Sequence, residues 1–203
     1  MNDMTCTLIG SLLDSSRSAD GQTIKTKILY DELLNKKLFG KLDFLNLADY
    51  KRNKIRLLLK VIHAYIHSDF IIFSVSRNGM RILYPLFYSL SHIWKRHIIQ
   101  VVIGGGLPQR TADHPKWIKY LKAFDRNYVE LQEMQKNLEL QGVNNVEVIP
   151  NFKRSSVVPI VLTRHNGQPK KLCTFSRVSE EKGILDAIHA VIGVNQRMKK
   201  TAY

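Results

Sequence analysis

Two short apolar runs, "DFIIFSV" (residues 69–75) and "HIIQVVI" (residues 97–103), decide the fold class. Neither alternates apolar with polar residues, and continuous apolar runs of this kind are typical of strands buried on both faces of a sheet. Segments with helical periodicity lie between the strand candidates, which is the βαβ pattern of a parallel sheet. We therefore predict an α/β protein: a Rossmann-like parallel sheet with helices on both faces.

The same pattern extends along most of the chain. Strands are predicted at residues 5–10, 42–47, 69–75, 97–103, 145–149 and 171–176. Helices are predicted at residues 53–68, 114–124, 130–141 and 184–200. Residues 153–170 contain prolines, a glycine and several basic residues but no helical period, so we expect a linker there. The predicted organisation is one complete domain over residues 1–152, then this linker, then the first strand and helix of an incomplete second domain over residues 171–203.

The helix predicted at residues 53–68 is amphipathic. Apolar side chains recur at helical spacing on one face: Ile55, Leu58, Leu59, Ile62 and Ile66. The opposite face carries basic or titratable side chains: Arg56, Lys60, His63 and His67. The two histidines lie one turn apart and could share an ion. No third ligand is spaced to complete a metal site, so we interpret them as solvated surface residues.

The charge of the chain is its strongest compositional signal. The 203 residues include 31 Lys and Arg against 17 Asp and Glu, a formal net charge of +14. Such a surface attracts polyanions such as nucleic acid, anionic lipid headgroups or diphosphate-containing ligands. The two cysteines, Cys6 and Cys173, have no metal-binding spacing and favour a reduced cytoplasmic compartment. No apolar stretch is long enough to span a bilayer, so any membrane association is expected to be peripheral, on the inner face.

The stretch "CTFSRVSEEKG" (residues 173–183) has the chemistry of an anion site. An apolar run ends at Arg177, and Lys182 and a glycine precede a helical pattern. Unpaired backbone N–H groups and the helix dipole favour negative charge at a helix N-terminus. A planar guanidinium and a mobile ammonium can grip a diphosphate together. From the residues alone, a diphosphate site and a pair of solvated surface charges both remain open.

A run of three glycines, Gly104, Gly105 and Gly106, follows the predicted strand at residues 97–103. Glycines at the carboxyl edge of a parallel sheet let a ligand approach the backbone closely. The run is neither a dinucleotide-binding fingerprint nor a phosphate-binding P-loop, because the residues after it do not fit either motif. A cleft-lining role and a simple tight turn both remain open.

Two segments carry a resemblance to a known family. "LCTFSRVSEEKGILDAIHAV" (residues 172–191) contains an arginine, four residues and then Lys-Gly after its apolar run, and "NNVEVIPNF" (residues 144–152) precedes the predicted linker. The first resembles the opening of the second domain, and the second the closing segment of the first domain, in GT-B glycosyltransferases of the retaining family four, also called glycosyl transferases group 1. The order and separation of the two segments, and the preceding βα pattern, agree with that family.

The resemblance implies a function and a set of site residues. The family transfers a sugar from a nucleotide-diphosphate sugar to an acceptor with retention at the anomeric carbon, and no metal is required. Arg177 and Lys182 are then expected to be the catalytic cations that stabilise the leaving diphosphate. The residues expected to line the donor and acceptor cleft are Gly21, Gln22, Gly104, Gly105, Gly106 and Asn151. The loop "SADGQT" ahead of the first helix departs from the family, because it has one glycine where many members have two.

The expected partners follow from the same interpretation. They are a nucleotide sugar, a saccharide or lipid-linked acceptor and an anionic membrane surface, with nucleic acid disfavoured because no recognised binding module is present. The sequence ends soon after Lys182, so we expect a missing donor domain or a partner chain to complete the site, and little or no transferase activity from these residues alone. Two alternatives remain: a non-catalytic acceptor- or membrane-binding half-subunit, and a basic α/β protein that binds anions or RNA.

Overall fold

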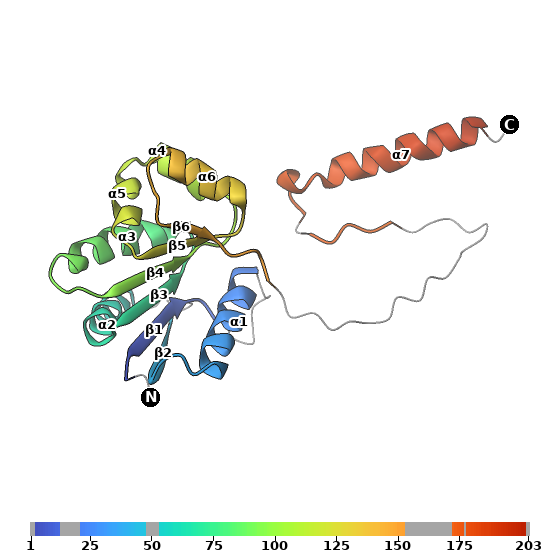
Figure 1. Ribbon diagram of the computed structural model, residues 1–203. Coiled ribbons are helices and arrows are strands. Elements are labelled where there is room, and N and C mark those ends of the chain that lie inside the picture. Colours follow the sequence, from blue (N-terminus) through green and yellow to red (C-terminus); the bar gives the residue numbers. More distant parts are fainter. Residues whose placement is uncertain (1–2, 13–20, 48–52, 153–171, 177, 202–203) are drawn as a thin grey trace. The chain divides into compact units, whose positions relative to one another are not determined.

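The computed structural model describes residues 3–12, 21–47, 53–152, 172–176 and 178–201 (Figure 1). The chain divides into two units, Met1–Ser156 and Val157–Tyr203, and each is described by itself. The predicted linker at residues 153–170 lies outside the described residues and stays a prediction.

The first unit is built on a six-stranded sheet in which every pairing is parallel. Its spatial order is β2-β1-β3-β4-β5-β6. The strands are β1 (Thr5–Gly10), β2 (Lys41–Asn46), β3 (Phe70–Ser74), β4 (His97–Val101), β5 (Arg126–Val129) and β6 (Val146–Val148). The predicted Rossmann-like α/β class is therefore confirmed. The order reverses direction between β1 and β3, and the carboxyl end of such a switch point is where open α/β sheets bind ligands.

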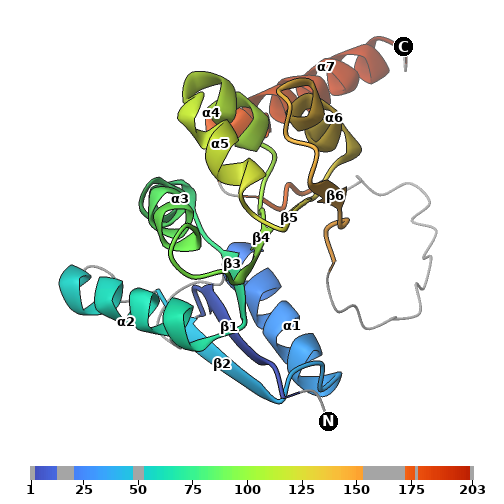
Figure 2. The ribbon, with the colours of Figure 1, turned by 60° about the vertical axis from the view of Figure 1, so that its left-hand side comes forward.

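Helices cover both faces of the sheet, as predicted (Figure 2). They are α1 (Gly21–Asn35), α2 (Lys54–His67), α3 (Arg77–Ser91), α4 (Leu107–Asp113), α5 (Lys116–Lys122) and α6 (Gln132–Leu140). On one face, Leu29 and Leu33 of α1 pack against the buried side chains of Cys6 and Leu8. On the other face, α2 to α6 all contribute side chains to one larger core.

Aromatic side chains form the centre of the larger core. The ring of Phe73 in β3 meets the rings of Tyr84, Phe87 and Phe124 edge-on, at centroid distances of 6.3, 5.2 and 5.4 Å. Edge-to-face contacts of this kind add to the stabilisation from burial alone. The core therefore fixes α3 and the end of α5 against the middle of the sheet.

The apolar stripe that the sequence pattern marks on α2 is not the face that the helix buries most deeply. Ile55 and Leu59 are 76% and 61% exposed, whereas Val61 and Tyr65 are buried. Apolar residues occupy most of the circumference of this helix, so the sequence offers two apolar stripes. The aromatic ring of Tyr65 stacks on Phe87 and its hydroxyl donates to the Trp94 carbonyl, which favours the stripe that contains it.

Two strand predictions also failed. The strand β5 was missed, because "RNYV" is short and starts with a charged and a polar residue. The strand predicted at residues 171–176 is wrong: the described residues 172–176 form no strand, and Leu172 and Phe175 are 74% and 104% exposed. A strand requires a ladder partner, and the described part of the chain pairs none with this segment.

The described residues of the second unit include a 3₁₀ turn at Glu180–Lys182, followed by α7 (Ile184–Thr201). Gly183 ends the turn in the left-handed conformation, with φ +61°. The helix predicted at residues 184–200 is confirmed. No side chain is buried in the described residues 172–198.

Candidate functional site

All the strands are parallel, so their carboxyl ends meet at one edge of the sheet. At the switch point there, α1 approaches the sheet closely at Gly10. A Cβ atom on Gly10 would lie 2.7 Å from Thr26 Cγ2 and 3.2 Å from the Ser74 carbonyl oxygen. Only glycine permits this approach. The Gln22 side-chain amide then donates to the same Ser74 carbonyl at 3.4 Å.

A buried ion pair joins the loops of this edge. Lys25 Nζ of α1 lies 2.8 Å from Glu130 Oε1, directly after β5, and the two side chains are 4% and 13% exposed. Glu130 Oε2 accepts a hydrogen bond from the Gly104 N–H, at 3.1 Å. Lys25 Nζ also lies 5.2 Å from the centre of the Phe152 ring, after β6. One lysine and one glutamate therefore tie together α1 and the segments that follow β4, β5 and β6.

The predicted cleft residues lie at this edge, but not all in the expected conformation. Gly21 and Gln22 are the first two residues of α1, not part of a loop ahead of it. Of the three consecutive glycines, only Gly104 has a positive φ, +81°, and nothing lies within 4 Å of where its Cβ would be. Gly105 is equally open, and Gly106 caps α4. Asn151 is exposed.

The Gly104 turn already binds an anion, namely the Glu130 carboxylate. A second negative group placed on that N–H would meet the carboxylate at close range. The turn is therefore better suited to a neutral ligand such as a sugar hydroxyl than to a phosphate.

A pocket of about 370 Å³ lies at the same edge, between the first turns of α2 and α3. Most of its lining is apolar and comes from both helices and from the ends of the strands: Leu47, Leu57, Leu58, Val61, Val75, Gly79, Ile82 and Leu83. Polar groups are contributed by Ser11, Lys54, Ser76 and Asn78. An apolar pocket with a few polar groups is the usual form of a small-molecule site.

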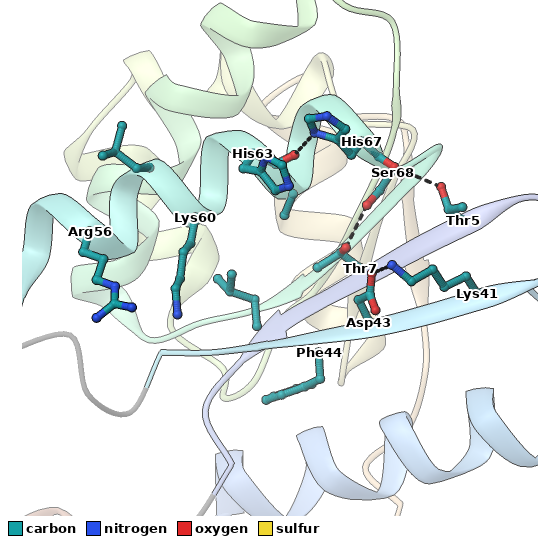
Figure 3. Close-up of a pocket in the computed structure, with 13 residues that line it drawn as sticks. Thr5, Thr7, Lys41, Asp43, Phe44, Arg56, Lys60, His63, His67 and Ser68 are labelled. Atoms are coloured by element: carbon teal, nitrogen blue, oxygen red, sulfur yellow. Dashed lines mark hydrogen bonds and ion pairs between the residues drawn. The ribbon is translucent and has the colours of Figure 1, made fainter.

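A basic groove of about 480 Å³ lies on the other side of α2, over β1 and the edge strand β2. Figure 3 shows the side chains of Arg56 and Lys60 pointing from the helix toward β2. Across the groove, Lys41 Nζ is paired with Asp43 Oδ2 at 2.7 Å. A neighbouring hollow of about 490 Å³ shares Arg56 and Lys60, so the basic lining continues along α2.

The histidine pair of α2 lines this groove. The His63 and His67 rings are 4.0 Å apart, and His67 Nδ1 contacts the His63 carbonyl at 2.8 Å. Across the described segments of the chain, no three His, Cys, Asp or Glu side chains gather in a group that could hold a metal ion.

The two predicted catalytic residues belong to the second unit. Arg177 lies outside the described residues, so its role stays a prediction. Lys182 is exposed and is the last residue of the 3₁₀ turn, where its backbone N–H donates to the Ser179 carbonyl at 3.1 Å. The expected arrangement, a strand leading directly into a helix N-terminus, is not formed by residues 172–176 and 178–184.

Sequence reasoning missed Lys25 and Glu130. Lys25 stands among polar residues in "TIKTK", which looks like a solvated helix face. Glu130 directly follows β5, the strand that was not predicted. An acidic residue placed immediately after a recognised parallel strand would have pointed to the carboxyl edge.

Comparison with known proteins adds no assignment. A scan against models of protein families found no match to this chain, and a search of curated proteins found no significantly similar sequence. None of the helices in the described part of the chain is long and apolar enough to cross a membrane.

Proposed function

We propose that this chain is the acceptor-side part of a retaining GT-B glycosyltransferase together with the start of its donor-binding domain. One observation carries the proposal: at Arg177–Gly183 an arginine is followed by four residues and then by Lys-Gly. The segment "NNVEVIPNF" precedes this motif at the separation that the family shows. The Rossmann-like sheet of the first unit supports it, because this family builds both of its domains on such sheets.

In the proposed reaction, the bond between the anomeric carbon of the sugar and the diphosphate oxygen breaks. A new bond forms from the anomeric carbon to an acceptor oxygen, and the acceptor hydroxyl passes its proton to the departing diphosphate oxygen. Negative charge accumulates on the departing nucleoside diphosphate. Arg177 and Lys182 stabilise that charge in the transition state, so no metal ion is needed.

The acceptor is a saccharide or a lipid-linked saccharide in polysaccharide or glycolipid biosynthesis. The pocket between α2 and α3 supports this, because its apolar lining suits a sugar ring face or a prenyl chain and its polar groups suit hydroxyls. We place the protein in the cytoplasm, peripheral on the inner face of the membrane.

The test is a transfer assay on the polypeptide encoded by the complete reading frame that contains these residues. Labelled nucleotide-diphosphate sugars are the donors, and membrane lipid extracts supply the acceptors. Arg177→Ala is expected to lower kcat by about 10²–10³, the usual loss when one preorganised charge-stabilising group is removed. Lys136→Ala, a change at an exposed lysine of α6, is the matched control and should leave kcat unchanged.

The outcomes separate the class of enzyme from the role of the residue. Transfer that survives Arg177→Ala with unchanged kcat excludes the diphosphate role. No transfer from any donor, with a folded protein, excludes the enzyme class.

One observation favours a second candidate, a non-catalytic acceptor-binding subunit completed by a partner chain. No side chain is buried in the described residues 172–198, and apolar side chains of α7 such as Leu185 and Ile188 are 65% and 48% exposed. Co-purification of a stoichiometric partner that carries the donor site would establish this alternative.

A further inference from the structure

The outward side of α2 carries an apolar ridge that contacts the core only through Ile62 among its four residues. Ile55, Leu59, Ile62 and Ile66, here called the α2 ridge, recur at intervals of four, three and four residues and so share one face of the helix. Ile55 and Leu59 are 76% and 61% exposed, and the other two are half-buried. At 1.5 Å per residue, the ridge is about 16 Å long.

A basic stripe runs beside the ridge, about 100° around the helix, and not on the opposite face as the sequence pattern suggested. Arg56, Lys60, His63 and His67, here called the α2 basic flank, have the same spacing one residue further along. They line the groove in Figure 3. Among the described residues, neither Arg56 nor Lys60 forms an ion pair, so both charges are available to an external anion.

The turn after α3 extends this surface beyond the end of α2. Arg96 donates to the Ile66 carbonyl at 2.6 Å, and the Tyr65 hydroxyl donates to the Trp94 carbonyl at 3.1 Å. These bonds hold the turn against the last turn of α2. Ile93 and Trp94 in it are 68% and 36% exposed, and Lys95 is exposed beside them.

We propose that this face, made of the α2 ridge, the α2 basic flank and the turn at Ile93–Lys95, docks the protein on an anionic lipid bilayer. An apolar stripe flanked by basic side chains, with a tryptophan at one end, matches a surface that is apolar below and anionic at the headgroups. The net charge of +14 adds long-range attraction to it. RNA fits this face less well, because aliphatic side chains offer bases no stacking platform.

The docking surface adjoins the pocket at the carboxyl edge. Leu58 on α2 and Ile82 on α3, 39% and 59% exposed, both line that pocket. A docked protein thus brings the pocket close to the headgroup layer, where a lipid-linked acceptor would enter. This last step rests on the proposed function, but the docking itself does not.

The test is sedimentation of the 203-residue chain with vesicles, which needs no transferase activity. Vesicles of phosphatidylcholine alone are compared with vesicles in which phosphatidylglycerol makes up a third of the lipid. We expect binding to the anionic vesicles only, weakened when salt rises from about 0.1 M to 1 M, where the screening length falls from about 10 Å to 3 Å.

Two double variants separate the ridge from the flank. Ile55→Ser/Leu59→Ser should weaken vesicle binding at least about tenfold, because two large apolar side chains no longer insert. Arg56→Gln/Lys60→Gln should weaken it by about 10- to 30-fold, since each basic group near the headgroups contributes about fivefold. The matched controls are Leu131→Ser/Leu140→Ser, at leucines 54% and 85% exposed, and Lys116→Gln/Lys136→Gln. Circular dichroism checks that every variant is folded.

Three results would overturn the proposal. One is the absence of vesicle binding by the unmodified chain. Another is an equal loss in the control variants, which would show that total charge or apolarity, not this face, drives binding. The third is concentration-dependent self-association, without vesicle binding, that the ridge variant abolishes, because the face would then bind a second copy of this chain.

Discussion

The two units of this chain carry the same kinds of residue in opposite environments. Each has one cysteine, Cys6 in β1 and Cys173 after the linker, and the first is buried whereas the second is exposed. The first unit has a dense core, and the family-like segment "NNVEVIPNF" contributes the buried Val146 to it, whereas the second unit carries the Arg177–Gly183 motif on a segment with no buried side chain among its described residues. The difference shows that a sequence motif can suggest a chemical role for a segment without indicating whether that segment packs into a core.

Thiol reactivity should show the largest contrast between the units. Burial raises the pKa of Cys6 from 9.0 to about 12, so its reactive thiolate is about a thousandfold scarcer than that of an ordinary cysteine. In the native protein we expect a disulfide reagent to modify Cys173 quickly and Cys6 at least about 10³-fold more slowly. Absorbance of the released thiol gives both rates, and in denaturant the two should become equal. If both thiols of the native protein react quickly, β1 must open readily, and the predicted difference in reactivity between Cys6 and Cys173 would be wrong.

Two phenylalanines provide the next contrast. Phe73 is fully buried and contacts three aromatic rings, whereas Phe175 is 104% exposed. Phe73→Ala should lower the free energy of unfolding by about 3–5 kcal/mol, since a large cavity opens in the core. Phe175→Ala should change it by no more than about 0.5 kcal/mol. Urea unfolding followed by circular dichroism measures both, and a large loss from Phe175→Ala would show that residues 172–176 belong to a packed structure.

The sequence alone was sufficient for the class of fold and for most strands. The runs that became β1, β3 and β4 are short and largely apolar because the sheet buries them on both faces. The sequence was not sufficient to predict β5, because Arg126 and Asn127 at its start are not typical strand residues. Nor was it sufficient to predict which side of α2 is buried, because two apolar stripes fit the helical period equally well. Only tertiary packing decides which stripe faces the sheet.

The sequence was enough to predict that the candidate site lies at the carboxyl edge of the sheet. It was not enough to predict which residues contact one another there. Glycines after buried strands pointed to the carboxyl edge, and the structure places Gln22 and the Gly104 turn there. The ion pair that joins them spans 105 residues of sequence, from Lys25 to Glu130, and no local pattern signals a contact of that range. The face formed by the α2 ridge was hidden for a related reason, because an exposed apolar stripe and a buried one have the same sequence pattern.

The Lys25–Glu130 ion pair allows a last comparison between two lysines. Lys25 is buried and paired in the first unit, whereas Lys182 is exposed and was singled out only by its place in a sequence motif. Lys25→Met removes the partner of a mostly buried carboxylate and should destabilise the first unit by about 3 kcal/mol. Lys182→Met, at an exposed residue of the second unit, should change stability by no more than about 0.5 kcal/mol. The double variant Lys25→Met/Glu130→Gln should recover much of the loss, because the buried charge is gone and the amide oxygen can still accept from the Gly104 N–H. Urea unfolding of the unmodified protein, Lys25→Met, Glu130→Gln and the double variant gives the coupling energy between positions 25 and 130. If Lys25→Met lowers the free energy of unfolding no more than Lys182→Met does, the ion pair does not stabilise the first unit. The sheet alone then holds the loops of the carboxyl edge, and the pair is available to bind a ligand instead.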